Sequence, residues 1–507
     1  MKRTIWAFLL LIPVLAMGCG KKNTEPIVDP VKAVITVSGA KEFNWDCEGG
    51  TATVTFSCDQ EWAFSIDENW ITADPASGKA GNGIEVTLTC AKNTSSASRD
   101  MYILITSGDT REPVKVAQSG DPMSGAAPEI KNGDEVLATN PLVEKFLTEV
   151  DYEDKTYDQY TKIFDYYGGF DGKTLTWDNW ETEWPDGDKP SEFSIRWNEK
   201  DMESGKMSLH LEDALGWSGD MEIAAGARFV NITNLVPNDT YTFKVTTASG
   251  KALAQGSFTT TGHLHQVFFT GPTTKKKGVI AKGSGARNAR DLGGWTGLDG
   301  KKVKYRKVYR GGRLNEKWTP YPLNAKGQQE VLFEGIGAQL DLRGNSDVIF
   351  EPAVPGLAHC APVIEEGGKT MLVNDHEKTK QCFEFVVNCV REGKPVYFHC
   401  SLGRDRTGTL DILLLGLLGV REGVIAKEYE VTYFAPVGYS VSSSDKKSNP
   451  IPTFHNTRMA WVYSDVVPYF WQLAGEGTFA EGVEKYLLEV AGVSQKDIDD
   501  FRNLMLE

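Results

Sequence analysis

The chain has 507 residues, of which 40% are hydrophobic and 24% are charged. These fractions are those of a globular protein, and they exclude a collagen, a coiled coil and a disordered chain. The 54 basic and 69 acidic residues give a formal net charge of −15. This charge argues against a nucleic-acid partner, although it is compatible with one small basic pocket for phosphate. At about 150 residues per domain, the length predicts three to four domains.

The N-terminus has the pattern of an export signal. The basic pair Lys2-Arg3 precedes an apolar stretch over residues 5–17, and small residues lead to Cys19. Such a pattern is typical of a secretory signal peptide. A cysteine directly after glycine resembles a bacterial lipoprotein signal, although Ala16 stands where leucine is usual. The resemblance implies that residues 1–18 are removed and that lipidated Cys19 anchors the protein to a membrane of a Gram-negative cell envelope, in the periplasm or outer membrane.

An ordinary signal peptide or a short membrane anchor is the alternative for this N-terminus. The apolar run 410–420 is too short to span a bilayer and contains Asp411. Residues 19–32 are predicted to be a polar tether. The eight cysteines include no close Cys-x-x-Cys pair, and no cluster of metal-ligand residues is visible, so we expect neither a metal site nor a cofactor.

Residues 33–120 contain short alternating or apolar strands separated by turn clusters, which predicts a β-sandwich. Trp70-Ile71, Pro75-x-Ser77-Gly78 and the closing segment 114–120 resemble a BACON module. That family implies an immunoglobulin-like sandwich of exported bacterial lipoproteins, and its name suggests contact with glycans. Trp62 and Trp70 could stack on a sugar, but we expect both in the core.

The next part of the chain is predicted to hold a second sandwich. Residues 121–190 are either a linker or part of this sandwich, with a short helix over 140–150. Strand patterns return over 191–262, where Leu235-x-Pro237 precedes an alternating strand. This arrangement resembles the later strands of a fibronectin type III domain. Residues 263–280 are predicted to be a linker.

From residue 281 to 507 the pattern changes to short apolar strands, such as 338–342 and 396–398, that alternate with helical windows. The windows cover residues 377–392, 406–420 and 421–434, and a capping pattern at Ser494 predicts a last helix. Alternating strands and helices predict an α/β domain with a central, mostly parallel sheet. The whole chain is therefore predicted to be multidomain, with all-β immunoglobulin-like sandwiches before a C-terminal α/β domain.

The strongest motif begins where the apolar strand ends at Cys400. Five residues later comes Arg406, followed by Thr407-Gly408 and an apolar helix. In a short loop before a helix, backbone N–H groups converge into a site for an anion. We therefore expect the loop to bind the substrate's phosphate through the residues Ser401, Leu402, Gly403 and Arg404.

Each side chain of this motif has a chemical reason. Arg406 can hold two phosphate oxygens in a bidentate fork. The positive environment favours the thiolate of Cys400, which can attack phosphorus and form a phospho-cysteine intermediate. Thr407 can donate a hydrogen bond to the sulfur and help it leave. We expect His399 to brace the loop rather than to act as a base.

The Cys-x5-Arg motif is the signature of protein tyrosine phosphatases. The segments 288–294, 309–314 and 341–343 resemble the bacterial tyrosine-phosphatase-like family, and the resemblance covers about residues 280–507. It implies a phosphatase that acts on phosphorylated proteins without a metal. In that family the first segment packs beside the phosphate-binding loop, so Arg290 and Asp291 are candidate substrate-binding residues. Ion pairs that only brace the site are the alternative for both.

The general acid has two candidates. Asp405 lies in the loop beside Arg406, and bacterial relatives with a basic-Asp-Arg loop are thought to use that aspartate. Asp375 precedes a predicted helix, near the position expected for a mobile acid loop. Trp184-Pro185-Asp186 resembles the acid motif of tyrosine phosphatases, but its position far upstream, in another predicted domain, argues for coincidence.

Arg404 bears on the substrate. A second basic residue in the loop resembles phosphatases that accept phosphoinositides or inositol phosphates, although those usually carry lysine there, and extra positive charge suits a polyanion. A pair between Arg404 and a neighbouring carboxylate is the alternative. The leading functional hypothesis is an exported, lipid-anchored phosphatase. The second is a surface glycan-binding lipoprotein whose phosphatase-like domain is idle.

Overall fold

The computed structural model describes residues 32–149, 152, 187–271, 285–316, 323–435 and 456–507. The chain divides into two compact units, residues 1–124 and 125–507. The predicted signal peptide, Cys19 and the sequence Trp184-Pro185-Asp186 lie outside the described residues. Within the described ranges, no helix has both the length and the apolar character needed to cross a membrane.

The first unit is a β-sandwich, as predicted. Its strands alternate buried and exposed residues, so that one face of each sheet forms the core. One sheet has the order β1 (Ile35–Val37), β3 (Gly50–Cys58), β7 (Gly81–Cys90), β5 (Ile71–Asp74). The other sheet has the order β2 (Glu42–Trp45), β9 (Thr110–Gln118), β8 (Arg99–Ser107), β4 (Trp62–Ser65), β6 (Ser77–Gly78).

Both tryptophans considered for sugar stacking lie in this core. Trp62 is 4% exposed and meets the ring of Phe56 edge-on, with the ring centroids 4.9 Å apart. Trp70 is 7% exposed, and the guanidinium of Arg99 covers its ring at 4.7 Å. Neither ring presents a free face to a sugar.

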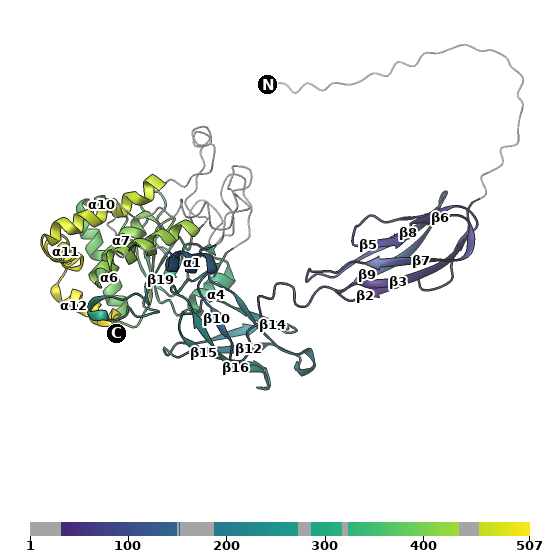
Figure 1. Ribbon diagram of the computed structural model, residues 1–507, viewed down its shortest axis with the longest axis horizontal. Coiled ribbons are helices and arrows are strands. Elements are labelled where there is room, and N and C mark those ends of the chain that lie inside the picture. Colours follow the sequence, from purple (N-terminus) through teal and green to yellow (C-terminus); the bar gives the residue numbers. More distant parts are fainter. Residues whose placement is uncertain (1–31, 150–151, 153–186, 272–284, 317–322, 436–455) are drawn as a thin grey trace, which may run out of the picture. The chain divides into compact units, whose positions relative to one another are not determined.

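The second unit begins with another sandwich, in which β12, β15 and β16 lie side by side (Figure 1). Tyr241 closes a corner of this sandwich, because its hydroxyl accepts a hydrogen bond from the N–H of Val236 at 2.8 Å. One sheet has the order β10 (Glu135–Leu137), β16 (Ala252–Thr261), β15 (Thr240–Thr247), β12 (Met207–Asp213), β13 (Ser218–Ile223). The other pairs β11 (Phe193–Arg196) with β14 (Phe229–Ile232).

The described parts of region 121–190 contribute to two domains. Its strand β10 completes the second sandwich, whereas its helix α1 (Pro141–Glu149) packs into the hydrophobic core of the C-terminal domain. Phe146 of α1, which is fully buried, lies 5.7 Å from the ring of Phe434. Residues 263–271, predicted as part of a linker, are mostly buried, and β17 (Phe269–Thr270) pairs with β18 (Gly285–Ala286).

The C-terminal domain has a five-stranded sheet in which three of the four strand pairs are parallel. This arrangement confirms the predicted α/β architecture. The strand order is β19 (Arg290–Asp291), β20 (Val308–Gly311), β23 (Val396–His399), β21 (Ala338–Asp341), β22 (Ala358–Cys360). β23 therefore occupies the centre of the sheet, and all four of its residues are buried.

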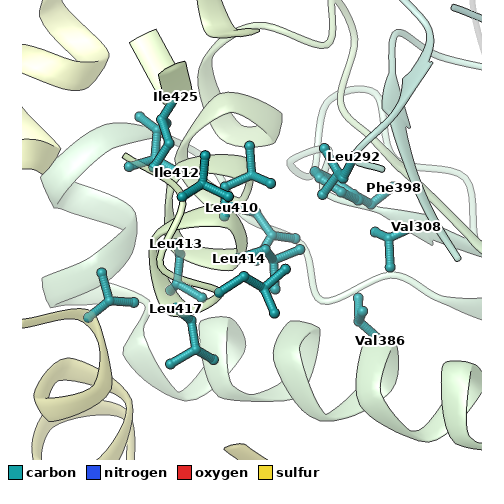
Figure 2. Close-up of a cluster of buried hydrophobic side chains, with 14 of the residues drawn as sticks. Leu292, Val308, Val386, Phe398, Leu410, Ile412, Leu413, Leu414, Leu417 and Ile425 are labelled. Carbon is teal, nitrogen blue, oxygen red and sulfur yellow. The ribbon is translucent and has the colours of Figure 1, made fainter. Parts of the chain in front are cut away.

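The helices of this domain cover the sheet and form a large hydrophobic core. Figure 2 shows leucines of α7 in one cluster with Phe398 of β23, Val308 of β20 and Val386 of α6. The apolar run 410–420 thus belongs to a core helix. The helices are α4 (Ala325–Phe333), α5 (Gly368–Asn374), α6 (His376–Arg391), α7 (Asp405–Leu417), α8 (Glu422–Glu430), α10 (Asn456–Ala474), α11 (Phe479–Lys485) and α12 (Gln495–Met505).

The capping residue and the apolar windows in the sequence correctly predicted four helices of this domain. The side chain of Ser494 accepts a hydrogen bond from the N–H of Asp497, so it caps α12 as the sequence predicts. The helical windows at 377–392, 406–420 and 421–434 correspond to α6, α7 and α8 with the following turn Val431–Phe434. The helices α4, α5, α10 and α11 were not predicted.

Candidate active site

The Cys-x5-Arg loop, residues 400–406, joins the central strand β23 to the N-terminus of α7. Cys400 follows the last residue of the strand and is 3% exposed. Gly403 has a positive φ of 71°, and a Cβ atom there would lie 2.4 Å from the carbonyl carbon of Gly311. A glycine is therefore required at this position, both for the backbone conformation and for the close approach to β20.

Side chains hold the first two carbonyl groups of the loop. The Nδ1 atom of His399 lies 3.1 Å from the carbonyl oxygen of Cys400. Arg313 donates from its guanidinium to the carbonyl oxygen of Ser401 at 3.1 Å. The Ser401 hydroxyl donates in turn to a carboxylate oxygen of Asp347.

Side chains from the edge of the sheet hold the next two carbonyl groups. The amide of Asn288 donates to the carbonyl oxygens of Leu402 at 3.2 Å and Gly403 at 3.0 Å. Arg310 of β20 also donates to the carbonyl oxygen of Gly403, at 2.7 Å. Asn288 and Arg310 are fully buried, so water does not compete for these bonds.

These contacts orient the loop for anion binding. In a trans peptide, the carbonyl of one residue and the N–H of the next point in opposite directions. Donors that hold the carbonyl groups of residues 400–403 therefore turn the N–H groups of residues 401–404 to the other side of the loop. The structure thus brings together the four residues that the sequence predicts for phosphate binding, and within the described ranges no protein acceptor binds their N–H groups.

The electrostatics at Cys400 favour the thiolate. Burial by itself raises the pKa of this thiol. The charge of Arg406 and the neighbouring hydroxyl and backbone N–H of Thr407 outweigh burial, so the pKa lies below its usual range, although the charge of Asp405 opposes the shift. Because the thiolate is the nucleophilic form, the loop activates Cys400.

His399 is a neutral brace in this structure. Burial lowers its pKa to about 4, although the charge of Asp341 opposes the shift. The amide nitrogen of Gln339 lies 2.9 Å from Nε2 of His399 and can only donate, so Nε2 accepts. The ring proton then resides on Nδ1 and is donated to the carbonyl oxygen of Cys400.

Arg406 lies against a neighbouring loop. Its guanidinium donates to the carbonyl oxygen of Ile364 at 2.9 Å. A Cβ atom at Gly367 would lie 2.7 Å from the carbonyl carbon of Asp405, so residues 364–367 pack directly on the start of α7. One guanidinium nitrogen of Arg406 is thereby anchored, which orients the fork for an oxyanion.

The two candidate general acids have different surroundings. Asp405 is in the loop, its side chain is 33% exposed, and its charge acts on the thiol of Cys400. Asp375 lies between α5 and α6 and forms an ion pair with Lys378 at 2.8 Å. The same Lys378 donates to the carbonyl oxygen of Val363. Both carboxylates are thus paired with a cation, Asp375 with Lys378 and Asp405 with Arg404, and Asp405 is the one whose charge acts on the thiol of Cys400.

Arg404 pairs with its neighbour. Its Nε atom lies 2.8 Å from one carboxylate oxygen of Asp405, and its terminal nitrogen lies 3.0 Å from the other. This bidentate pair is the second of the two roles considered for Arg404. It neutralises much of the extra positive charge that would attract a polyanion.

Arg290 and Asp291 brace the site from behind and do not reach its surface. Arg290 is 1% exposed, and its guanidinium binds Glu428 and the side-chain oxygen of Asn288. Asp291 is 0% exposed and accepts hydrogen bonds from His265 and from the backbone of Arg306. A substrate-binding role for these two residues is therefore corrected to a bracing role, because buried protein groups occupy their polar atoms.

A buried charge network supports the same edge of the sheet. Arg310 donates to Glu428 at 2.8 Å and to Asp411 of α7. Burial favours the neutral form of Glu428, but the charges of Arg290 and Arg310 lower its pKa to about 2. Burial raises the pKa of Asp411 well above its usual range despite Arg310. Glu428 is thus the ionised partner that compensates the buried guanidiniums.

Sequence reasoning missed several supporting residues. Asn288, Arg310 and Arg313 lie within segments that resemble the family, but nothing in their spacing indicates which carbonyl each one binds. Asp347 and Gln339 lie outside any recognised signal, and only their three-dimensional neighbours reveal their roles. Among the described residues, no group of three or more His, Cys, Asp or Glu side chains could hold a metal ion.

Comparison with known families agrees with this geometry. Residues 282–507 match the model described as the tyrosine phosphatase family, and the match includes the whole Cys-x5-Arg loop. Residues 282–507 are therefore similar to the tyrosine phosphatase family, and we call them the phosphatase domain. Residues 36–121 match the model of the viral BACON domain, so a BACON module precedes the phosphatase domain.

Individual relatives are distant. A protein of Cupriavidus necator whose name proposes a tyrosine-protein phosphatase is 28% identical over 167 residues, which cover 28% of this chain and 59% of the relative. This chain thus spans little more than half the length of that curated relative.

Solved structures with similar parts include a Bacteroides ovatus GH5 xyloglucanase in complex with a heptasaccharide. It is 19% identical, covering 21% of this chain and 27% of the xyloglucanase, with a TM-score of 0.17. A two-domain fibronectin type III segment of chicken tenascin is 8% identical, covering 44% of this chain and 95% of the segment, with a TM-score of 0.12. At such TM-scores, neither likeness says anything about activity.

Proposed function

We propose that this protein is a cysteine-dependent phosphatase that hydrolyses phosphomonoesters through a phospho-cysteine intermediate. The thiolate of Cys400 attacks phosphorus, the bond from phosphorus to the leaving oxygen breaks, and Asp405 gives its proton to that oxygen. Water then attacks the phospho-cysteine while Asp405 takes up a proton. Phosphate leaves, and the thiolate of Cys400 is restored.

The arrangement of the loop carries this proposal. Side-chain donors hold four successive carbonyl groups, which leaves the N–H groups of residues 401–404 for the oxygens of a transferring phosphoryl group. The lowered pKa of Cys400 supplies the nucleophile in the same place. An idle domain would not need both features.

Phosphotyrosine proteins are the proposed substrates, ahead of phosphoinositides and inositol phosphates. The pair between Arg404 and Asp405 removes the main reason for expecting a polyanion. The alternative of a glycan-binding protein loses the two tryptophans that were considered for sugar stacking, because the rings of Trp62 and Trp70 are buried.

Phosphate release by the purified chain tests this function directly. The panel holds a phosphotyrosine peptide, a phosphoserine peptide, a phosphoinositide and inositol hexakisphosphate, in a chelating buffer. We expect the phosphotyrosine peptide to be the best substrate and Cys400→Ser to abolish its turnover. Arg406→Lys is the matched control for the fork, because it retains the charge and loses the bidentate geometry. A folded wild-type chain with no turnover on any substrate would contradict the proposal.

We also propose that the protein is a lipoprotein of a Gram-negative cell envelope, anchored through Cys19. The basic start, the apolar stretch over residues 5–17 and the position of Cys19 support this location. Metabolic labelling with a fatty acid and membrane fractionation test it. Label and membrane association should both disappear in Cys19→Ala, and a wild-type chain that takes up no label would rule out the anchor.

A further inference from the structure

A carboxylate from outside the matched phosphatase region lies directly behind the Cys-x5-Arg loop. Asp188 lies between α1 and β11 and is 3% exposed. Its two carboxylate oxygens receive a bidentate pair from Arg287, at 2.8 and 2.6 Å. The oxygen at 2.8 Å also accepts the backbone N–H of Asn288 at 2.8 Å.

Asn288 is the residue that transmits this contact to the loop. Its φ is 58°, in the left-handed region, which few residues other than glycine adopt, although asparagine does so more readily than most. Asp188 holds the N–H of Asn288 in that conformation, while the side chain of Asn288 reaches the carbonyl oxygens of Leu402 and Gly403. The chain of contacts from Asp188 to the loop therefore has one intermediate residue.

The segment that carries Asp188 is itself anchored. The amide of Gln266 donates to the carbonyl oxygen of Gly187 at 2.7 Å. A Cβ atom at Gly187 would lie 2.9 Å from the side chain of Phe434, so this segment packs closely on the C-terminal domain. Asp188 thus has a defined position.

We propose that Asp188 is a positioning residue for the phosphatase reaction, and that the catalytic unit therefore extends upstream of the family domain. By fixing Asn288, Asp188 keeps the carbonyl groups of Leu402 and Gly403 turned away from the substrate. The N–H groups of Gly403 and Arg404 then point at the phosphoryl oxygens. This inference rests on the proposed function of the same loop.

A matched pair of charge-balanced variants of the full chain isolates this effect. Asp188→Asn with Arg287→Met removes both buried charges but retains an acceptor for the N–H of Asn288. Asp188→Leu with Arg287→Met removes the same charges and also the acceptor, at similar side-chain volume. Neither variant leaves an unpaired buried charge at this site. The two should therefore differ mainly in whether the side chain at position 188 accepts a hydrogen bond from the N–H of Asn288.

Two readouts report on the loop without turnover. One is the affinity for inorganic vanadate, measured by calorimetry, with Arg406→Ala to show that binding occurs at the loop. The other is the pH dependence of iodoacetamide alkylation at Cys400, followed by mass spectrometry of its peptide. Both remain informative if no substrate is turned over, so failure of the proposed function is distinguishable from failure of this inference.

We expect the Asn variant to bind vanadate nearly as the wild type does, and the Leu variant roughly 10- to 100-fold more weakly. The pH at which Cys400 becomes reactive should rise in the Leu variant alone. Equal vanadate affinities in the two variants, whether both normal or both weakened, would overturn the positioning role. Melting temperatures of both variants show whether each chain is folded under the assay conditions.

Discussion

Both β-sandwich regions of this chain have ion pairs at the surface, but the second sandwich also has a buried one. In the BACON module, ion pairs such as Lys92 with Glu48 lie at the surface, where both side chains are more than half exposed. In the second sandwich, Asp213 is fully desolvated against Arg306 of the phosphatase domain. The guanidinium of Arg306 also binds Glu334 and lies 4.2 Å from the ring of Trp217.

This difference shows that similar folds need not have similar roles. Exposed pairs add little stability and do not tie one region to another. A buried guanidinium that is shared between the second sandwich and the phosphatase domain stabilises the pair of domains only as long as both are present. We conclude that the second sandwich and the phosphatase domain belong to one compact unit, residues 125–507, whereas the BACON module lies in the other unit.

The largest expected effect is on kcat/KM when either the BACON module or the second sandwich is removed by truncation. A chain that starts at residue 125 should keep kcat/KM within about twofold, because it retains the complete second unit. A chain that starts at residue 282 should be insoluble or lose at least about 100-fold in kcat/KM. It lacks Val143, Phe146 and Leu147 from the hydrophobic core, and losing one large buried side chain costs about 2–5 kcal/mol. Full activity and an unchanged melting temperature for residues 282–507 would break the comparison.

The next largest effect concerns the general acid within the catalytic unit. Asp405→Asn should lower kcat about 100-fold or more for an alkyl phosphate, whose leaving oxygen needs a proton. The loss should be smaller for an aryl phosphate with an acidic leaving group. Asp375→Asn is the matched control and should change kcat less than about threefold, since Asp375 lies outside the Cys-x5-Arg loop. The opposite ranking of the two variants would assign the acid to Asp375.

Removing one charge from the buried network and one from a surface pair compares what each contributes to stability. Arg306→Met should lower the free energy of unfolding by about 3–5 kcal/mol, because it leaves the buried Asp213 and Glu334 without their partner. Lys92→Met in the BACON module should leave the melting temperature of that module unchanged. Urea titration followed by calorimetry measures both, and equal effects would show that the buried network does not stabilise the second unit.

A smaller, pH-dependent effect should come from His399. Its folded pKa of about 4 lies below the usual value near 6.5, so the unfolded chain binds the proton first as pH falls. Stability should therefore decrease between about pH 6.5 and pH 4, by up to about 3 kcal/mol for this residue. Unfolding free energies of wild type and His399→Gln across this range measure it. A parallel pH dependence in the two proteins would exclude His399 as the cause.

Local patterns predicted much of the fold. The strands around the first core and the helices α6, α7 and α12 have clear periodicity, turn residues or caps, all of which are encoded over a few neighbouring residues. The weaker pattern of residues 121–190 left its role open. That region divides between two cores, and a division of this kind depends on distant partners that no local pattern contains.

The sequence by itself determined the chemistry of the loop. Nucleophile, anion-binding backbone and arginine fork are contiguous in Cys400–Arg406, and a strand–loop–helix segment brings them together without help from afar. Only the tertiary structure decided what holds that loop. Its carbonyl groups are bound by Arg313, 88 residues from Ser401, and by Asn288, 115 residues from Gly403. Hydrogen bonds between such distant residues form only when the sheet and the upstream segment have packed, because desolvation and close approach are properties of the folded core.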